Sequence, residues 1–121
     1  MAEEKCACSG AYLDKFIQPS VLVVLSEGPA HGFRLMTELR RRELVSYAGF
    51  DATGFYRTLK KMEQAGLVRG EAHAFNGKVR RVFSITEEGR RCLVNWYMTL
   101  CAYRSNVSHI VRCIEQTLDR Q

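Results

Sequence analysis

The sequence contains no apolar run long enough to cross a membrane. Its longest aliphatic stretch runs only from Val21 to Leu25, whereas a membrane-spanning helix needs about 20 apolar residues. The first ten residues, MAEEKCACSG, have neither the charge pattern nor the apolar centre of a secretory signal peptide. These absences predict a cytoplasmic protein without a membrane partner.

Residue sets typical of enzyme active sites are also missing. We find no Ser/His/Asp set, no phosphate-cradling glycine loop and no close pair of carboxylates in the sequence. We therefore expect a protein that is not an enzyme.

The chain has few prolines but five cysteines. In a cytoplasmic protein, cysteines are thiols, metal ligands or redox groups more often than a disulfide framework. His109 and Cys113 are four residues apart, so on a helix they share one face and can chelate an ion. Cys6 and Cys8 form a second possible chelate, and the four residues together suit a metal or metalloid ion. A reversible disulfide, or no sensing role at all, is the alternative.

Positive charge is concentrated in the middle of the chain. The 121 residues carry a formal net charge of +5. Residues 31–91 contain 13 Lys and Arg against 7 Asp and Glu, which gives +6, and the remainder contains 5 against 6, which gives −1. Such a local surplus indicates either contact with an acidic polymer such as nucleic acid or an ordinary solvated surface.

Two helices are predicted before residue 43. Pro19 can open the first, because the N–H that proline lacks has no partner in a first helical turn. The second is expected from His31 to Arg42, with the triplet Arg40, Arg41 and Arg42 in its last turn. These cations either oppose the negative end of the helix dipole or contact phosphate.

A third helix is predicted within the stretch FDATGFYRTLKKMEQAGLV, residues 50–68. Phe55, Leu59 and Met62 form one apolar stripe at helical spacing. Asp51 or Thr53 is the expected N-cap, and Gly66 is the expected C-terminal stop. The face opposite the stripe is basic and carries a tyrosine.

The periodicity changes after Gly66 and predicts a hairpin. Residues 67–74 and 80–85 read as two short strands joined through Asn76-Gly77, a strong hairpin signal. Lys78, Arg80 and Arg81 crowd the turn and the start of the return strand. The hairpin tip is therefore expected to be basic.

Three helices followed by a basic hairpin predict a mainly α protein with a winged helix-turn-helix and a two-stranded β wing. The expected parts are an N-terminal arm and helix at 1–18, a winged-helix DNA-binding domain at 19–86 and a C-terminal dimerisation helix at 87–121. In this architecture the third helix enters the major groove of duplex DNA, and the wing lies along phosphates. A winged-helix module that binds protein instead is the alternative. The candidate DNA-binding residues are Thr53, Tyr56, Arg57, Lys60, Lys61, Lys78, Arg80 and Arg81.

Three segments, PSVLVVLSEGPAHGFRLMTELRRR, GFYRTLKKMEQAGLV and GKVRRVFSITEEGRR, together resemble the PadR family of bacterial transcriptional regulators. The resemblance covers residues 19–91. It implies a homodimeric winged-helix repressor that binds a two-fold-related DNA operator. It also carries over Tyr56 and the wing positions Lys78, Arg80 and Arg81 as DNA-facing residues.

The C-terminal segment is predicted to form one long helix, because residues 87–118 contain no proline and only one glycine. Apolar residues there alternate by four and three, the spacing of a coiled-coil seam, with Arg104 as the only break. Pairing with a second copy is the simplest way to bury such a stripe, and folding back on the same domain is the alternative. The expected dimerisation residues are Leu93, Tyr97, Leu100, Val107, Val111, Ile114 and Leu118.

The N-terminal segment has an apolar stripe of its own, made by Tyr12, Leu13, Phe16 and Ile17. In proteins of the PadR family this helix packs beside the C-terminal helix of the partner, and effector pockets lie near the same junction. The resemblance therefore implies a small-molecule effector site here. Aromatic residues that either line such a pocket or belong to the core are Trp96, Tyr97 and Tyr103.

Overall fold

The computed structural model describes residues 16–45 and 50–120. Of the predicted N-terminal arm and helix at 1–18, residues 1–15 lie outside the described residues, and they include Cys6, Cys8, Tyr12 and Leu13. The elements in chain order are α1 (Ile17–Ser26), β1 (Ala30–His31), α2 (Gly32–Arg41), α3 (Ala52–Gln64), β2 (Val68–Phe75), β3 (Lys78–Ile85) and α4 (Glu87–Asp119).

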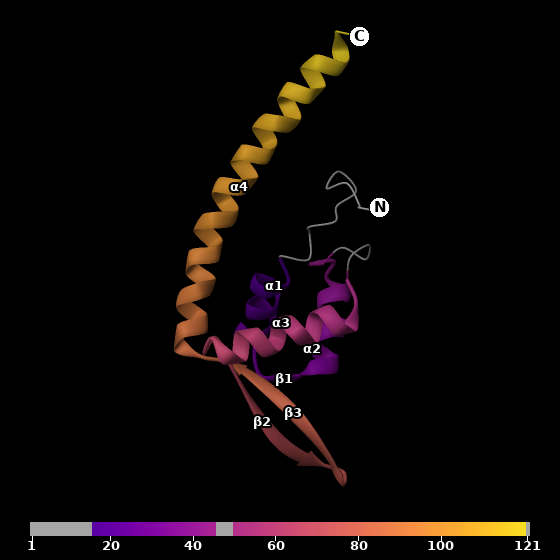
Figure 1. The fold of residues 1–121 in the computed structure, drawn as a ribbon, viewed down its shortest axis with the longest axis vertical. Coiled ribbons are helices and arrows are strands. Elements are labelled where there is room, and N and C mark those ends of the chain that lie inside the picture. The colour runs from indigo at the N-terminus through magenta and orange to yellow at the C-terminus, as the bar shows by residue number, and fades with distance from the viewer. Residues whose placement is uncertain (1–15, 46–49, 121) are drawn as a thin grey trace.

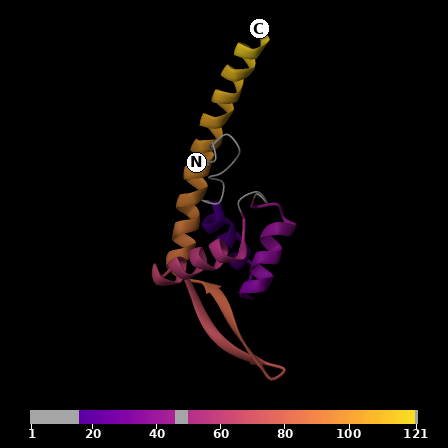
Figure 2. The same ribbon diagram turned by 45° about the vertical axis from the view of Figure 1, so that its right-hand side comes forward.

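Three short helices form the body of the molecule, and two long elements project from it. The β2–β3 hairpin extends from one end of the body. Helix α4 begins beside the hairpin base, runs along the body and projects beyond its opposite end (Figure 1). After a turn of 45° the hairpin and α4 still point away from each other (Figure 2). The predicted mainly α winged helix-turn-helix is therefore confirmed. Among the described residues, no helix combines the length and apolar character needed to cross a membrane.

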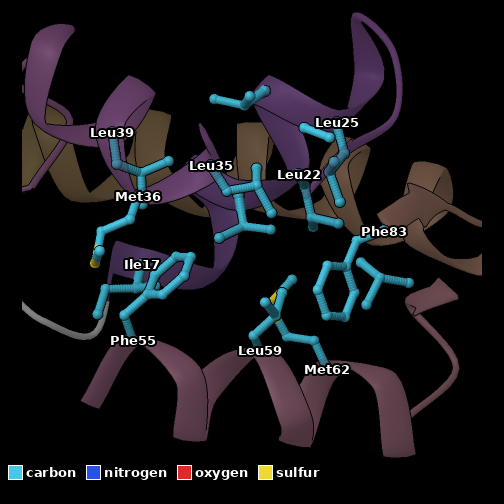
Figure 3. Packing of buried hydrophobic residues seen from close by; sticks show 14 of the residues in the cluster. Ile17, Leu22, Leu25, Leu35, Met36, Leu39, Phe55, Leu59, Met62 and Phe83 are labelled. Atoms are coloured by element: carbon cyan, nitrogen blue, oxygen red, sulfur yellow. The ribbon is translucent and has the colours of Figure 1, made fainter. Parts of the chain in front are cut away.

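The core lies between α3 and the pair formed by α1 and α2. Phe55, Leu59 and Met62 project from α3 toward Leu22, Leu25, Leu35 and Leu39 of the other two helices (Figure 3). Phe55 and Leu59 are 0% and 1% exposed, so the predicted apolar stripe is the buried face of α3. This orientation places the polar face of α3 outward.

Local signals set the ends of the helices. The side chain of Asp51 caps α3, with Oδ1 accepting from the Gly54 N–H at 2.6 Å, so Asp51 and not Thr53 is the N-cap. Gly66 follows the helix with φ of 81°, as expected for a glycine stop. Helix α1 begins at Ile17, two residues before Pro19, which occupies its first turn.

The wing is the predicted hairpin with one added strand. Asn76 and Gly77 have φ of 52° and 77°, the left-handed pair that a two-residue hairpin turn requires. The sheet order is β1-β3-β2, because Ala30 and His31 pair with Phe83 and Val82. The sequence did not predict β1, which joins the start of α2 to the base of the wing.

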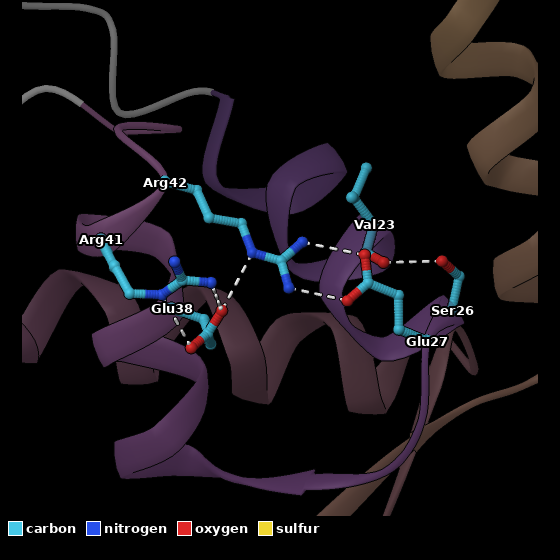
Figure 4. A network of polar contacts seen from close by, with 6 residues as sticks. All are labelled: Val23, Ser26, Glu27, Glu38, Arg41 and Arg42. Atoms are coloured by element: carbon cyan, nitrogen blue, oxygen red, sulfur yellow. Dashed lines mark hydrogen bonds and ion pairs between the residues drawn. The ribbon is translucent and has the colours of Figure 1, made fainter.

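The arginine triplet at the end of α2 makes contacts within the domain. Arg42 binds Glu27, the residue after α1, at 2.7 Å and Glu38 at 2.9 Å, and Arg41 binds Glu38 at 2.8 Å (Figure 4). Arg40 lies over the ring of Phe50, 5.1 Å from its centroid. These side chains therefore link the end of α2 to its surroundings within the same domain.

Among the described residues, the first half of helix α4 contacts the body. The Thr86 side chain accepts from the Gly89 N–H at 3.0 Å and also reaches the carbonyl oxygen of Leu67 at 3.0 Å. Two helical turns after Gly89, the Trp96 indole N–H donates to Oε1 of Gln18 at 2.8 Å. At 1.5 Å per residue, the 33-residue helix extends roughly 50 Å, so its second half lies beyond the body (Figure 1).

Candidate nucleic-acid interface

The outward face of α3 presents the residues that the sequence selected. Thr53, Tyr56, Arg57, Lys60 and Lys61 are all exposed, and Tyr56 retains 43% of its accessible surface. At 100° per residue, Thr53, Arg57 and Lys60 lie opposite the buried stripe. The face therefore combines hydrogen-bond donors with positive charge, which suits base edges and phosphates.

The Tyr56 ring packs closely against the backbone of residue 32, which is possible because that residue is glycine. A Cβ atom on Gly32 would lie 2.7 Å from Cε1 of the tyrosine ring, closer than carbon atoms approach. The ring of Phe55 meets the Tyr56 ring edge-on, with 5.0 Å between centroids. The start of α2 and the buried face of α3 thus position a side chain that faces solvent.

The three basic wing residues point to two sides of the hairpin. Arg81 bonds to Glu63 of α3, and its guanidinium carbon lies 5.8 Å from the centroid of Phe83. Gly70 leaves room for this arrangement, because a Cβ there would lie 2.9 Å from both side chains. Lys78 and Arg80 alternate with Arg81 along β3 and project from the other face. Arg81 consequently contacts α3, whereas Lys78 and Arg80 lie on the opposite face of the hairpin, where Arg80 reaches His31.

An open groove of about 390 Å³ lies between the start of α2, α3 and β3. The phenyl ring of Phe33 borders it and is 66% exposed. His31 caps α2, with Nδ1 accepting from the Arg34 N–H at 3.2 Å, and its Nε2 lies 3.1 Å from Nη1 of Arg80. The residues that line the groove are His31, Gly32, Phe33, Tyr56, Arg80, Arg81 and Phe83.

Sequence reasoning did not assign His31, Gly32 or Phe33 to this interface. The signal for them was the stretch GPAHGF, residues 28–33, which lies within the first of the segments that resemble the PadR family. The structural role of this stretch depends on the pairing of β1 with β3. That pairing brings together residues about 50 positions apart in the sequence. The motif places the start of α2 against the wing.

Helix α4 carries one apolar stripe that changes its environment along its length. Leu93 and Trp96 pack against the core of the same chain. Farther along, Val107, Val111 and Ile114 are 53%, 46% and 51% exposed. Within the described ranges, 16–45 and 50–120, no element covers this part of the stripe. The predicted seam residues Tyr97 and Leu118 are likewise exposed, whereas Leu100 is half-buried.

The predicted effector residues do not share one environment. Trp96 is half-buried and bonded to Gln18, Tyr103 meets Phe16 edge-on with 6.4 Å between centroids, and Tyr97 is 71% exposed. Trp96 and Tyr103 are two turns apart on the α4 face that contacts α1. Tyr97 projects elsewhere, and the structure brings only the other two toward α1.

The cysteines on α4 are separate from one another. Burial raises the pKa of the Cys92 thiol, which makes it a poor nucleophile at neutral pH. His109 and Cys113 are both exposed on α4, one turn apart as the sequence predicted. No group of three or more metal-ligating side chains occurs among the described residues. A larger ligand set would require Cys6 and Cys8, which lie outside them.

The body and its hairpin define a winged-helix protein of the helix-turn-helix class. A profile of the transcriptional regulator PadR-like family matches residues 21–95, more than half of the chain. The chain belongs to this family, whose members are transcriptional regulators rather than enzymes.

Solved structures of PadR-family proteins have the same fold. A regulator from Clostridium difficile superposes with a TM-score of 0.69 at 17% identity, covering 79% of this chain and 98% of that one. One from Eggerthella lenta gives 0.67 at 24% identity, covering 86% and 91%. Bacillus subtilis PadR in complex with operator DNA gives 0.58 at 20% identity, covering 67% of this chain and 45% of that one. No curated protein matches the sequence.

Proposed function

We propose that this regulator is a cytoplasmic homodimeric repressor that binds a two-fold-related site on duplex DNA. In each subunit, the outward face of α3 enters the major groove and the wing lies along the neighbouring backbone. The observation that carries the proposal is the arrangement of α3 with Tyr56, Arg57 and Lys60 exposed beside a basic hairpin. The operator complex of Bacillus subtilis PadR supports it.

Dimerisation through α4 explains the uncovered stripe. Five apolar side chains beyond residue 105 lie within a 100° arc of the helix, and each is between 46% and 63% exposed. Monomeric soluble proteins rarely expose a contiguous apolar stripe of this length. A second α4 covers it, and the two-fold axis of the pair gives the two recognition helices a symmetric placement. The five residues are Val107, Ile110, Val111, Ile114 and Leu118.

A salt titration of DNA binding tests the proposal. Fluorescence anisotropy of a labelled duplex should show affinity that falls linearly on a log–log plot as salt rises, because bound counterions are released from phosphates. A protein-interaction module with a winged helix would give no binding to duplex DNA, or binding insensitive to salt. Either of those results would remove the DNA-binding function.

Effector release is the regulatory part of the proposal. We place a flat apolar effector at the junction of α1 and α4, where Trp96 and Tyr103 lie. Trp96 is the only tryptophan in the chain, so its fluorescence reports on this junction without interference. A planar aromatic compound that binds there should quench the fluorescence and release DNA at the same concentration. Quenching without release would show a binding site that does not regulate.

A further inference from the structure

The two imidazole nitrogens of His31 face different hydrogen-bond donors. Nδ1 lies 3.2 Å from the backbone nitrogen of Arg34, and Nε2 lies 3.1 Å from Nη1 of Arg80. Both the backbone N–H and the guanidinium can only donate, whereas a neutral imidazole has one accepting nitrogen. In either neutral tautomer, one of the two contacts therefore sets a donor against a donor.

The helix cap determines which contact is the mismatched one. When Nδ1 accepts from Arg34 and caps α2, the ring proton is on Nε2 and points toward the guanidinium of Arg80. A doubly protonated ring would lose the cap and add a second positive charge beside Arg80. The arrangement is thus two converging donors, which are complementary to a shared anionic oxygen.

The surroundings match a nucleic-acid strand better than a free anion. His31 and Arg80 line the groove of about 390 Å³ that continues to Tyr56 on α3, with Phe33 and Phe83 on its walls. Glu63, the carboxylate of α3 nearest the wing, is bonded to Arg81, so its charge is compensated. A phosphate position next to exposed aromatic surface resembles the alternation of phosphate and deoxyribose along a DNA backbone.

We propose that His31 and Arg80 jointly bind one backbone phosphate of duplex DNA and that Phe33 contacts the adjoining deoxyribose. The inference rests on the proposed DNA-binding function. It extends the interface from α3 and the wing to the start of α2, and it gives the His31 cap a second role. The phosphate oxygen supplies the acceptor that reconciles the two donors.

Two substitutions separate the phosphate contact from the helix cap. In His31→Asn the amide oxygen retains capping ability, but the side chain is too short to stay beside Arg80. Arg80→Gln removes the charge while the cap stays intact. The binding of both single variants and the double variant to a labelled mixed-sequence duplex is measured by anisotropy across salt, with Arg112→Gln on the exposed surface of α4 as the charge-matched control.

The expected losses differ in their salt dependence. His31→Asn should weaken binding about 3- to 10-fold, with the salt slope unchanged, because the lost donor is neutral. Arg80→Gln should weaken binding and reduce the slope by about 1.8, because each of the two subunits on the duplex loses one phosphate contact worth about 0.9. The double variant should bind nearly as well as Arg80→Gln alone, since both side chains hold one phosphate. The control should bind like the wild type.

Other outcomes distinguish failure of the shared phosphate site from failure of the proposed DNA-binding function. Wild-type affinity in His31→Asn, or losses that multiply in the double variant, would overturn the shared phosphate site while DNA binding stands. No salt-sensitive binding by the wild type would instead overturn the proposed function. If His31→Asn melts at a lower temperature, its weaker binding has a structural cause, and the wild type is measured by NMR instead. The Nε2–H resonance of His31 must shift when duplex is added. An unshifted resonance refutes the site.

Discussion

Basic side chains in this domain divide into those that hold the fold together and those that face outward. Arg41 and Arg42 are bonded to Glu38, and Arg81 is bonded to Glu63. Arg57 and Lys60 instead stand on the exposed face of α3. Net charge alone does not distinguish the two groups, because the partner of each arginine depends on tertiary packing.

Replacing Arg57 with Ala should remove a contact to a base edge. We expect DNA affinity to fall by about 1–3 kcal/mol and base preference to relax at one position, since a guanidinium that pairs with a guanine discriminates by that amount. Selection of binding sites from a random duplex library, compared between wild type and variant, measures both. An unchanged preference would remove Arg57 from the reading residues, and Arg91→Ala on α4 serves as the charge-matched control.

At the scale of elements, the junction between the wing and α4 depends on close backbone packing. A Cβ atom at Gly89 would lie 2.2 Å from the carbonyl oxygen of Leu67. Thr86 caps α4 and bonds to the same carbonyl group. This geometry gives a physical reason for the Ile-Thr-x-x-Gly sequence at 85–89, where the helix start must touch the base of β2.

Substituting Gly89 with Ala should therefore destabilise the domain. Because the added methyl group meets backbone and not a flexible side chain, we expect the free energy of unfolding to fall by about 1–3 kcal/mol. Urea denaturation followed by circular dichroism measures the change. Arg90→Ala, one residue along on the exposed side, should behave like the wild type, and equal stability of the two variants would refute the tight junction.

Glu38 should make the domain sensitive to acid. Its hydrogen bonds to Arg41 and Arg42 lower the pKa of the carboxyl from 4.5 to about 2. A depressed carboxyl pKa stabilises the fold above the unfolded value, and the contribution is lost as pH falls from 4.5 toward 2. Glu38→Gln should lower the melting temperature at neutral pH and flatten its decline in that interval. Glu115→Gln on α4 should leave the curve unchanged, and a parallel curve for Glu38→Gln would contradict the assignment.

Local signals predicted most elements, whereas contacts distant in sequence were out of reach. The Asn76-Gly77 turn and the proline-free C-terminal segment determine the wing and α4 through neighbouring residues alone. Strand β1 has two residues and exists only because β3 pairs with it. In the same way, the bond from Arg81 to Glu63 and the packing of Tyr56 on Gly32 depend on how α2, α3 and the wing pack. The secondary structure was therefore predictable from the sequence. Which basic residues pair within the fold and which face outward was not.

In the proposed homodimer, a second copy of the chain buries the end of α4. We expect Val111→Glu to split the proposed dimer, because each subunit would place an unpaired carboxylate in an apolar seam. Size-exclusion chromatography with light scattering should show a monomer, and DNA affinity should drop because two half-sites are no longer bound together. Gln116→Glu adds the same charge on the opposite side of α4 and should stay dimeric. A dimeric Val111→Glu protein would place the interface elsewhere.

In the proposed complex, two copies of the chain are joined through α4 and place two α3 helices and two wings on one duplex. Native mass spectrometry of the protein mixed with a duplex that it binds tests this most directly, because it counts subunits and DNA together. We expect a dimer when the protein is alone and a complex of two chains with one duplex when DNA is added. A monomer alone, or one chain on one duplex at saturation, would contradict it.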